Sequence, residues 1–95
     1  MPAYLLVEIE ITDPELFEEY KRLVAPTIVA FGGRYLARGG ALESLEGGWD
    51  PRRLVIIEFP SMERARQWWE SDAYAPLKPM RIASARSRLL LVEGI

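Results

Sequence analysis

Four stretches of the chain are rich in aliphatic and β-branched residues, partly at alternating positions, which predicts half-buried strands. The first covers residues 4–11, where every second position from Leu5 to Ile11 is apolar. The others cover residues 34–38, 53–59 and 88–93. Paired glycines inside a strand mark a bulge or bend. We therefore expect the second strand to bend at residues 39–40 and to resume over residues 41–45.

Between the first two strands, apolar residues recur at three-and-four spacing, which predicts a helix. Asp13 is placed to cap its first N–H groups, and Pro14 suits its first turn. Gly32 and the glycine after it should end the helix. Because Pro26 has no N–H and collides with the preceding turn, the helix should kink or restart there.

A second helical segment begins after Ser61, a good N-cap residue, and is interrupted at residues 71–72. A short third helix reaches about Ser84. The order is therefore β-α-β-β-α-β, in which two right-handed crossovers interleave into one four-stranded antiparallel sheet. This is the ferredoxin-like α+β sandwich. We expect residues 1–95 to form this single domain, with the helices on one face and strands one and three in the centre.

The sheet face that the helices leave open is also apolar. If the side chains of Leu5 and Val55 face the helices, their neighbours in the sequence face away from them. The apolar residues expected on the open face are Tyr4, Leu6, Tyr35, Leu54, Ile56 and Leu91. A monomer rarely exposes such a patch, so we predict a homodimer packed sheet to sheet about a two-fold axis. The alternative is an exposed sheet that binds a ligand.

Composition excludes several classes of protein. The chain has no cysteine and no histidine, which removes disulfides, thiolate or imidazole catalysis, and the usual zinc and haem ligands. We expect no cofactor. A net charge of −2 argues against nucleic acid or an anionic membrane as a partner. Apolar runs are too short for a membrane helix, and the N-terminus has no secretion signal, so we expect a cytoplasmic protein.

Several segments together resemble a known family. The longer ones are DPELFEEY at 13–20, FGGRYLARGG at 31–40, EFPS at 58–61 and SDAYAPLKPMRIASARS at 71–87, and the shorter ones are 4–10, 25–27 and 91–94. In order and without gaps, they look like the bacterial domain of unknown function 1330 family, which belongs to the dimeric α+β barrel superfamily. The resemblance implies the same sandwich and a barrel-forming dimer. It implies no activity, because superfamily relatives range from cofactor-free oxygenases to stress proteins.

Two tyrosines and two arginines form the first candidate site. Tyr20 lies on the inner stripe of the first helix, and Arg38 ends a strand just before two glycines. Tyr74 and Arg81 come from the broken second helical region. All four can converge where the helices meet the sheet, where guanidinium and phenol groups suit a carboxylate or enolate. The alternative is that the tyrosines are core residues and the arginines pair with surface carboxylates.

Carboxylates form the second candidate group. By alternation Glu8, Glu10 and Glu58 share the open face, and Glu93 joins them if the last strand turns that way. Enclosure in a barrel would raise their pKa values and poise a general base, so Glu8 and Glu58 are the catalytic candidates. The alternative is ion pairing with neighbouring arginines. We expect no metal site, because the chain has no Asp-rich loop.

Three functions remain open from the sequence. The leading hypothesis is a dimeric barrel that binds a small anionic or polar organic molecule, held by Arg38 and Arg81 and shaped by Tyr20 and Tyr74. The second adds a proton transfer by a carboxylate or a tyrosine, as in an isomerase or a cofactor-free oxygenase acting on an enolisable substrate. The third is a structural or stress-type dimer without a ligand.

Overall fold

A computed structural model describes residues 1–95 and has the predicted element order. The strands are β1 (Ala3–Ile11), β2 (Arg34–Arg38), β3 (Arg53–Phe59) and β4 (Ala85–Glu93). The helices are α1 (Pro14–Ala30), α2 (Met62–Trp69) and α3 (Leu77–Ser84). The strands lie in the order β2-β3-β1-β4 with antiparallel neighbours. The ferredoxin-like α+β fold is confirmed, with β1 and β3 in the centre.

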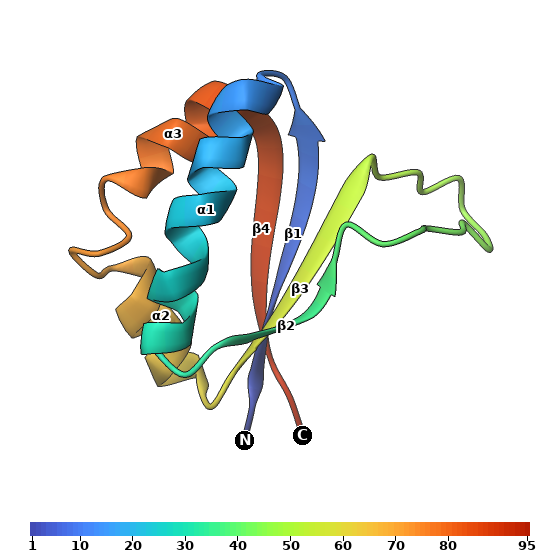
Figure 1. The fold of residues 1–95 in the computed structure, drawn as a ribbon. Coiled ribbons are helices and arrows are strands. Elements are labelled where there is room, and N and C mark those ends of the chain that lie inside the picture. Colours follow the sequence, from blue (N-terminus) through green and yellow to red (C-terminus); the bar gives the residue numbers. More distant parts are fainter.

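The three helices lie on one face of the sheet (Figure 1). Alternate residues of the central strands point toward them and are buried, namely Ala3, Leu5, Val7, Ile9, Val55, Ile57 and Phe59. Helix α1 adds its inner stripe to this core, namely Phe17, Tyr20, Val24 and Ile28. The alternation in the sequence thus becomes one buried layer between α1 and the centre of the sheet. No helix combines the length and the apolar character needed to cross a membrane.

Local signals set where two of the helices begin. The Asp13 carboxylate accepts a hydrogen bond from the Leu16 N–H at 3.2 Å at the start of α1. The Ser61 hydroxyl accepts from the Arg64 N–H at 3.1 Å at the start of α2. Each side chain satisfies a backbone donor that the first helical turn leaves without a partner.

Helix α1 does not restart at Pro26, so the predicted restart is wrong, while a kink there stays a prediction. The helix is continuous from Pro14 to Ala30. Arg22 and Pro26 are both exposed, so water can bond the Arg22 carbonyl that Pro26 leaves without a donor. On the opposite side, Val24 and Ile28 are buried against the sheet. Their packing holds the helix together across the proline.

Replacing this proline with alanine, Pro26→Ala, should stabilise the protein. Alanine restores an N–H for the Arg22 carbonyl and removes a clash, at an exposed position where little packing is lost. We expect the free energy of unfolding to rise by about 1–2 kcal/mol, measured as a higher urea midpoint. Pro14→Ala is the matched control and should give no gain, because proline fits the first helical position. A lower midpoint for Pro26→Ala would show that the fold depends on the proline.

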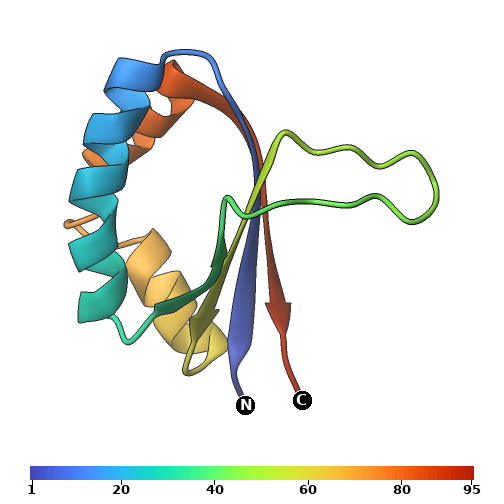
Figure 2. The same ribbon diagram turned by 45° about the vertical axis from the view of Figure 1, so that its right-hand side comes forward.

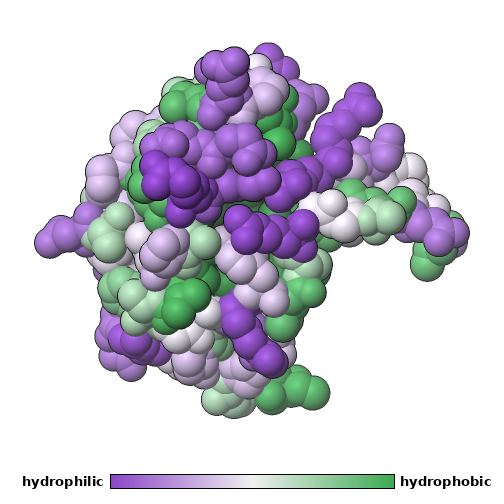
Figure 3. Space-filling model, in the orientation of Figure 1, coloured by the Kyte–Doolittle hydropathy of each residue, from purple (hydrophilic) through white to green (hydrophobic).

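Residues 39–52, here called the arm, leave the body of the protein on the side of the sheet away from the helices (Figures 1 and 2). They contain no strand, so the predicted strand over residues 41–45 is wrong. Gly39 has a φ of +71°, which turns the chain out of the sheet. Leu45 is 90% exposed and Trp49 57% exposed. Figure 3 shows the arm as a projection with hydrophobic and hydrophilic residues.

Two residues predicted for the open face lie on the helix face. Tyr35 lies opposite Ile57 and packs against the core, because an irregularity between Tyr35 and Ala37 shifts the register of β2. Leu91 lies opposite Leu5 and also packs against the core. The apolar side chains on the open face are therefore Tyr4, Leu6, Leu54, Ile56, Leu90 and Val92.

Candidate functional site

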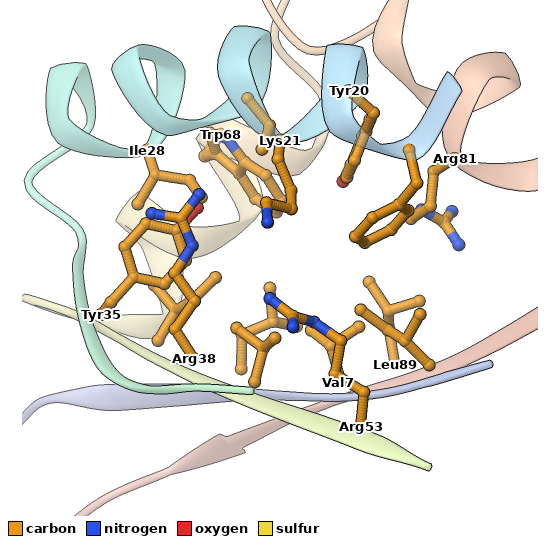
Figure 4. A pocket seen from close by; sticks show the side chains of 16 residues that line it. Val7, Tyr20, Lys21, Ile28, Tyr35, Arg38, Arg53, Trp68, Arg81 and Leu89 are labelled. Carbon is orange, nitrogen blue, oxygen red and sulfur yellow. The ribbon is translucent and has the colours of Figure 1, made fainter. Parts of the chain in front are cut away.

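A cavity lies between α1 and the centre of the sheet (Figure 4). Its wall is mostly apolar core. The polar or charged residues in the wall are Tyr20, Lys21, Tyr35, Arg38, Arg53 and Arg81. The enclosed part of the cavity is small, about 40 Å³, and the space reaches about 460 Å³ when the open mouth is included. This narrow space suits a small ligand.

Three of the four predicted ligand-binding residues form a hydrogen-bonded chain. The Nε of Arg81 donates to the Tyr74 hydroxyl at 3.2 Å. The Tyr74 and Tyr20 hydroxyl oxygens lie 3.0 Å apart. Because Tyr74 already accepts from Arg81, its own proton has a partner only if Tyr74 donates to Tyr20. The Tyr20 proton is then available to an acceptor in the cavity, which Tyr20 lines.

Local structure holds Tyr74 and Arg81 in this chain. The Tyr74 N–H donates to the Ser71 hydroxyl at 3.1 Å in the turn after α2. The Tyr74 ring packs 4.2 Å, centroid to centroid, from the Trp68 ring. Arg81 lies in the last turn of α3 and also donates to the Ser87 hydroxyl. Arg81 is buried, and its partners are neutral hydroxyls.

The pKa values of two tyrosines are raised. Burial, reinforced by the adjacent Tyr74, raises the pKa of Tyr20 far above its ordinary value of 10.0. Burial also raises the pKa of Tyr35, although the nearby Arg38 and Arg53 oppose the shift. Both phenols are therefore neutral at physiological pH, and they can donate hydrogen bonds but cannot act as bases.

The raised pKa of Tyr20 predicts a loss of stability at alkaline pH. In the unfolded chain Tyr20 ionises near its ordinary pKa of 10.0. In the folded chain it ionises only at higher pH, so its contribution to stability is complete below about pH 10 and is progressively lost as the pH rises above 10. Unfolding by guanidinium chloride measures this loss. Between about pH 9 and about pH 11.5, the denaturant concentration at the midpoint should fall less for Tyr20→Phe than for the parent protein. Equal falls in the two proteins would contradict the assignment.

Arginines reach the cavity from several elements. Arg38 ends β2 and is exposed, with its Cζ atom 4.4 Å from the centroid of the Tyr35 ring. Figure 4 shows Arg38 and Arg81 on opposite sides of the cavity, with Arg53 and Lys21 between them. The structure thus brings the predicted Arg38 to the same cavity as Tyr20 and Arg81, while Tyr74 supports them from behind the wall.

Two charged residues in the cavity wall, Arg53 and Lys21, were not among the candidates predicted from the sequence. Arg53 shares its face of β3 with Val55 and Ile57, so its position in the alternating pattern already placed it toward the helices. Lys21 follows Tyr20 on α1 and forms an ion pair with Glu18 at 3.0 Å. The hydrophobic pattern of the sequence predicts an apolar core here. The long side chains of Arg53 and Lys21 add charged groups to the cavity wall.

Arg53 is held tightly and lacks a partner. A β-carbon on Gly39 would lie 2.2 Å from an Arg53 terminal nitrogen, so the glycine makes room for the guanidinium group. The Nε of Arg53 is buried and has no hydrogen-bond partner. Neither Arg38, Arg53 nor Arg81 forms an ion pair. No carboxylate lines the cavity, so the charged side chains in its wall are all cationic.

The two candidate catalytic carboxylates lie on the open face, away from the cavity. Glu58 pairs with Arg34 at 2.9 Å. Glu8 accepts from the Nε of Arg88 at 2.7 Å and from the Trp49 indole at 3.1 Å. The bonds to Arg88 and then Trp49 lower the pKa of Glu8, whereas a general base would need a raised one. Both carboxylates have the ion-pair partners that the alternative interpretation assigned to them.

The remaining carboxylates of this group divide between the two faces. Glu10 pairs with Arg86 at 3.4 Å on the open face. Glu93 lies opposite the buried Ala3, which places it on the helix side of the sheet, apart from Glu8, Glu10 and Glu58. No group of three or more acidic residues is arranged to hold a metal ion.

Solved structures share the fold at low sequence identity. A protein of unknown function from Rhodopseudomonas palustris, RPA0582, is 20% identical with a TM-score of 0.81, over 99% of this chain and 82% of that one. A dimeric ferredoxin-like protein of unknown function from Jannaschia sp. CCS1 is 14% identical with a TM-score of 0.73, over 99% and 100%. SnoaB, a cofactor-independent oxygenase from Streptomyces nogalater, is 12% identical with a TM-score of 0.68, over 99% and 93%.

Family membership is clearer than these distant similarities. Among curated proteins, none matches the sequence. The family profile described as Domain of unknown function (DUF1330) matches residues 2–95. The resemblance carried by the segments from residue 4 to residue 94 is thereby confirmed, and the chain belongs to the DUF1330 family.

Proposed function

We propose that this protein binds a small organic anion in the cavity between α1 and the sheet. The observation that carries the proposal is the group of guanidinium side chains without acidic partners, Arg38, Arg53 and Arg81, in the wall of a mostly apolar cavity. Guanidinium groups bind carboxylates through paired, charge-assisted hydrogen bonds. The apolar wall suits the organic part of the ligand, and the Tyr20 hydroxyl adds a donor.

Binding is favoured over proton transfer by the groups in the cavity. No carboxylate lines it, and the pKa values of Tyr20 and Tyr35 are raised. The wall therefore offers hydrogen-bond donors and cations but no carboxylate or phenolate base at neutral pH. The fold is similar to that of a cofactor-independent oxygenase, so oxygen consumption with the best ligand is the assay for the alternative function.

Small carboxylates should raise the melting temperature. At about ten times its Kd, a ligand that binds only the folded state stabilises it by about 1.4 kcal/mol, or several degrees for a domain of this size. Hexanoate and benzoate are suitable probes. Arg81→Gln should abolish the shift. Arg66→Gln, an exposed α2 residue outside this cavity, should keep it. Absence of a shift with every carboxylate in the parent protein would refute the proposal.

We also propose that the protein is a homodimer formed through the open face of the sheet. Leu90 is 64% exposed and Val92 46% exposed there. The arm extends from the same side with Leu45 and Trp49 exposed. A second copy would cover these apolar side chains, as expected for a two-fold interface. The similar structure from Jannaschia sp. is described as dimeric. A cytoplasmic location stays a prediction.

A further inference from the structure

We propose that the ligand is a short dicarboxylate, bound with one end at Tyr20 and Arg81 and the other at Arg38 and Arg53. This inference rests on the proposed function, because it names the class of anion that the same cavity takes. It is carried by the balance of charge in the cavity wall, by the placement of the cations, and by the partner that Arg53 lacks.

A single carboxylate would neutralise only a small part of the positive charge in the cavity wall. Four cationic side chains line the cavity, and only Lys21 has an acidic partner, Glu18. Arg38, Arg53 and Arg81 remain without one. A monocarboxylate neutralises one of these three charges and a dicarboxylate neutralises two. The remaining charge is best tolerated at Arg38, which is exposed to solvent.

The cations are also spread across the cavity. In Figure 4, Arg81 and Tyr20 lie on one side and Arg38 on the other, with Arg53 between. One carboxylate has two oxygens, which a single guanidinium group occupies when it binds in the bidentate manner. A molecule with a carboxylate at each end can use both sides at once. Its middle then crosses the apolar floor, which includes Val7 and Val55.

Arg53 provides the guanidinium group that a second carboxylate would bind. The group forms no ion pair, and its Nε is buried without a hydrogen-bond partner, which is unfavourable, so a carboxylate at its terminal nitrogens would offset its charge. Its guanidinium group lies against Gly39 and 5.9 Å, from Cζ to the ring centroid, from Phe17. These contacts hold the group in place before any ligand binds, which lowers the entropic cost of binding.

Matched pairs of ligands test the inference directly. Each pair has the same chain length and differs in one carboxylate: butyrate with succinate, and hexanoate with adipate. Titration calorimetry at about pH 8.5, where both carboxylates are ionised, should give at least one dicarboxylate a Kd about tenfold or more below that of its partner. Butylphosphonate carries up to two charges on one group, and it should not match the better dicarboxylate.

Variants locate the second end of the ligand. Arg53→Gln should raise the Kd of the better dicarboxylate to about that of its monocarboxylate partner, with little change for the monocarboxylate. Arg81→Gln should weaken both ligands, because both use that end. Arg66→Gln lies outside this cavity and should change neither. If Arg53→Gln does not fold, the ligand pairs measured on the parent protein still decide the question.

The outcomes separate this inference from the proposed function. Equal affinity within both pairs, with Arg81→Gln weakening all four ligands, would overturn the dicarboxylate and leave the anion site in place. Butylphosphonate as tight as the better dicarboxylate would show that charge alone matters, and it would also overturn the two-ended arrangement. Absence of binding by every ligand would overturn both proposals.

Discussion

Replacing Ile56 with aspartate, Ile56→Asp, should convert a homodimer of this protein into monomers. Ile56 lies in β3 on the open face, opposite Leu6 of β1 and Ala37 of β2. A second copy packed on this face would enclose the new carboxylate without a partner, at a cost of several kcal/mol, on the order of 3–5. Light scattering at micromolar concentration should give about twice the chain mass for the parent and 10.8 kDa for the variant.

Val29→Asp is the matched control for this change. Val29 is 68% exposed on α1, on the helix side of the molecule. The same charge placed there should leave the dimer intact, because a sheet-to-sheet interface does not include it. A monomeric parent protein would end the argument for the dimer, and a dimeric Ile56→Asp variant would move the interface to another surface.

Replacing Trp68 with alanine should produce the largest loss of stability in the chain. Trp68 is 2% exposed, and its ring centroid lies 5.6 Å from that of Phe59 and 4.2 Å from that of Tyr74. Its indole N–H donates to the Thr27 hydroxyl at 3.0 Å. We expect Trp68→Ala to lower the free energy of unfolding by about 3–5 kcal/mol. Denaturant unfolding followed by circular dichroism measures this loss, which is a large part of the total for a small domain.

Trp49→Ala is the matched control for Trp68→Ala, because it also removes an indole ring but from an exposed position. Trp49 is 57% exposed in the arm, so its removal leaves no buried cavity and should cost much less. Trp68→Ala should also weaken carboxylate binding, because the Trp68 ring packs against Tyr74, and Tyr74 contacts both Tyr20 and Arg81. A loss below about 1 kcal/mol for Trp68→Ala would contradict its place in the core.

Local signals in the sequence were sufficient for most of the fold. The caps at Asp13 and Ser61 act within one turn, and the alternation in β1 reports one buried face. Predictions failed where distant contacts decide the outcome. Packing of α1 on the sheet outweighs the local cost of Pro26. A one-residue irregularity in β2 turns Tyr35 to the helix face, and no feature of the sequence marks its position.

Some features of the candidate site could likewise be predicted from the sequence, and others depend on distant contacts. Tyr20 was identifiable from the inner stripe of the first helix and Arg81 from its place in the broken second helical region, and the structure places both in the cavity wall. Arg53 was also identifiable, since it shares the alternation of β3, but a charged residue at the start of a strand is easily assigned to the surface. The missing partner of its Nε is a property of packing. It cannot be inferred until the neighbours of Arg53 are known.

Because Gly39 and Arg53 are in close contact, a substitution at one of these positions affects what the other position can hold. While Arg53 is present, any side chain at position 39 collides with its guanidinium group and also strains a backbone with a φ of +71°. Loss of the arginine removes the collision but leaves the strain. Glycine can therefore persist after Arg53 is lost, whereas a larger residue at position 39 would move the flexible end of Arg53 away from its place beside the cavity. Glycine at position 39 thus keeps both the turn into the arm and the position of the Arg53 guanidinium group.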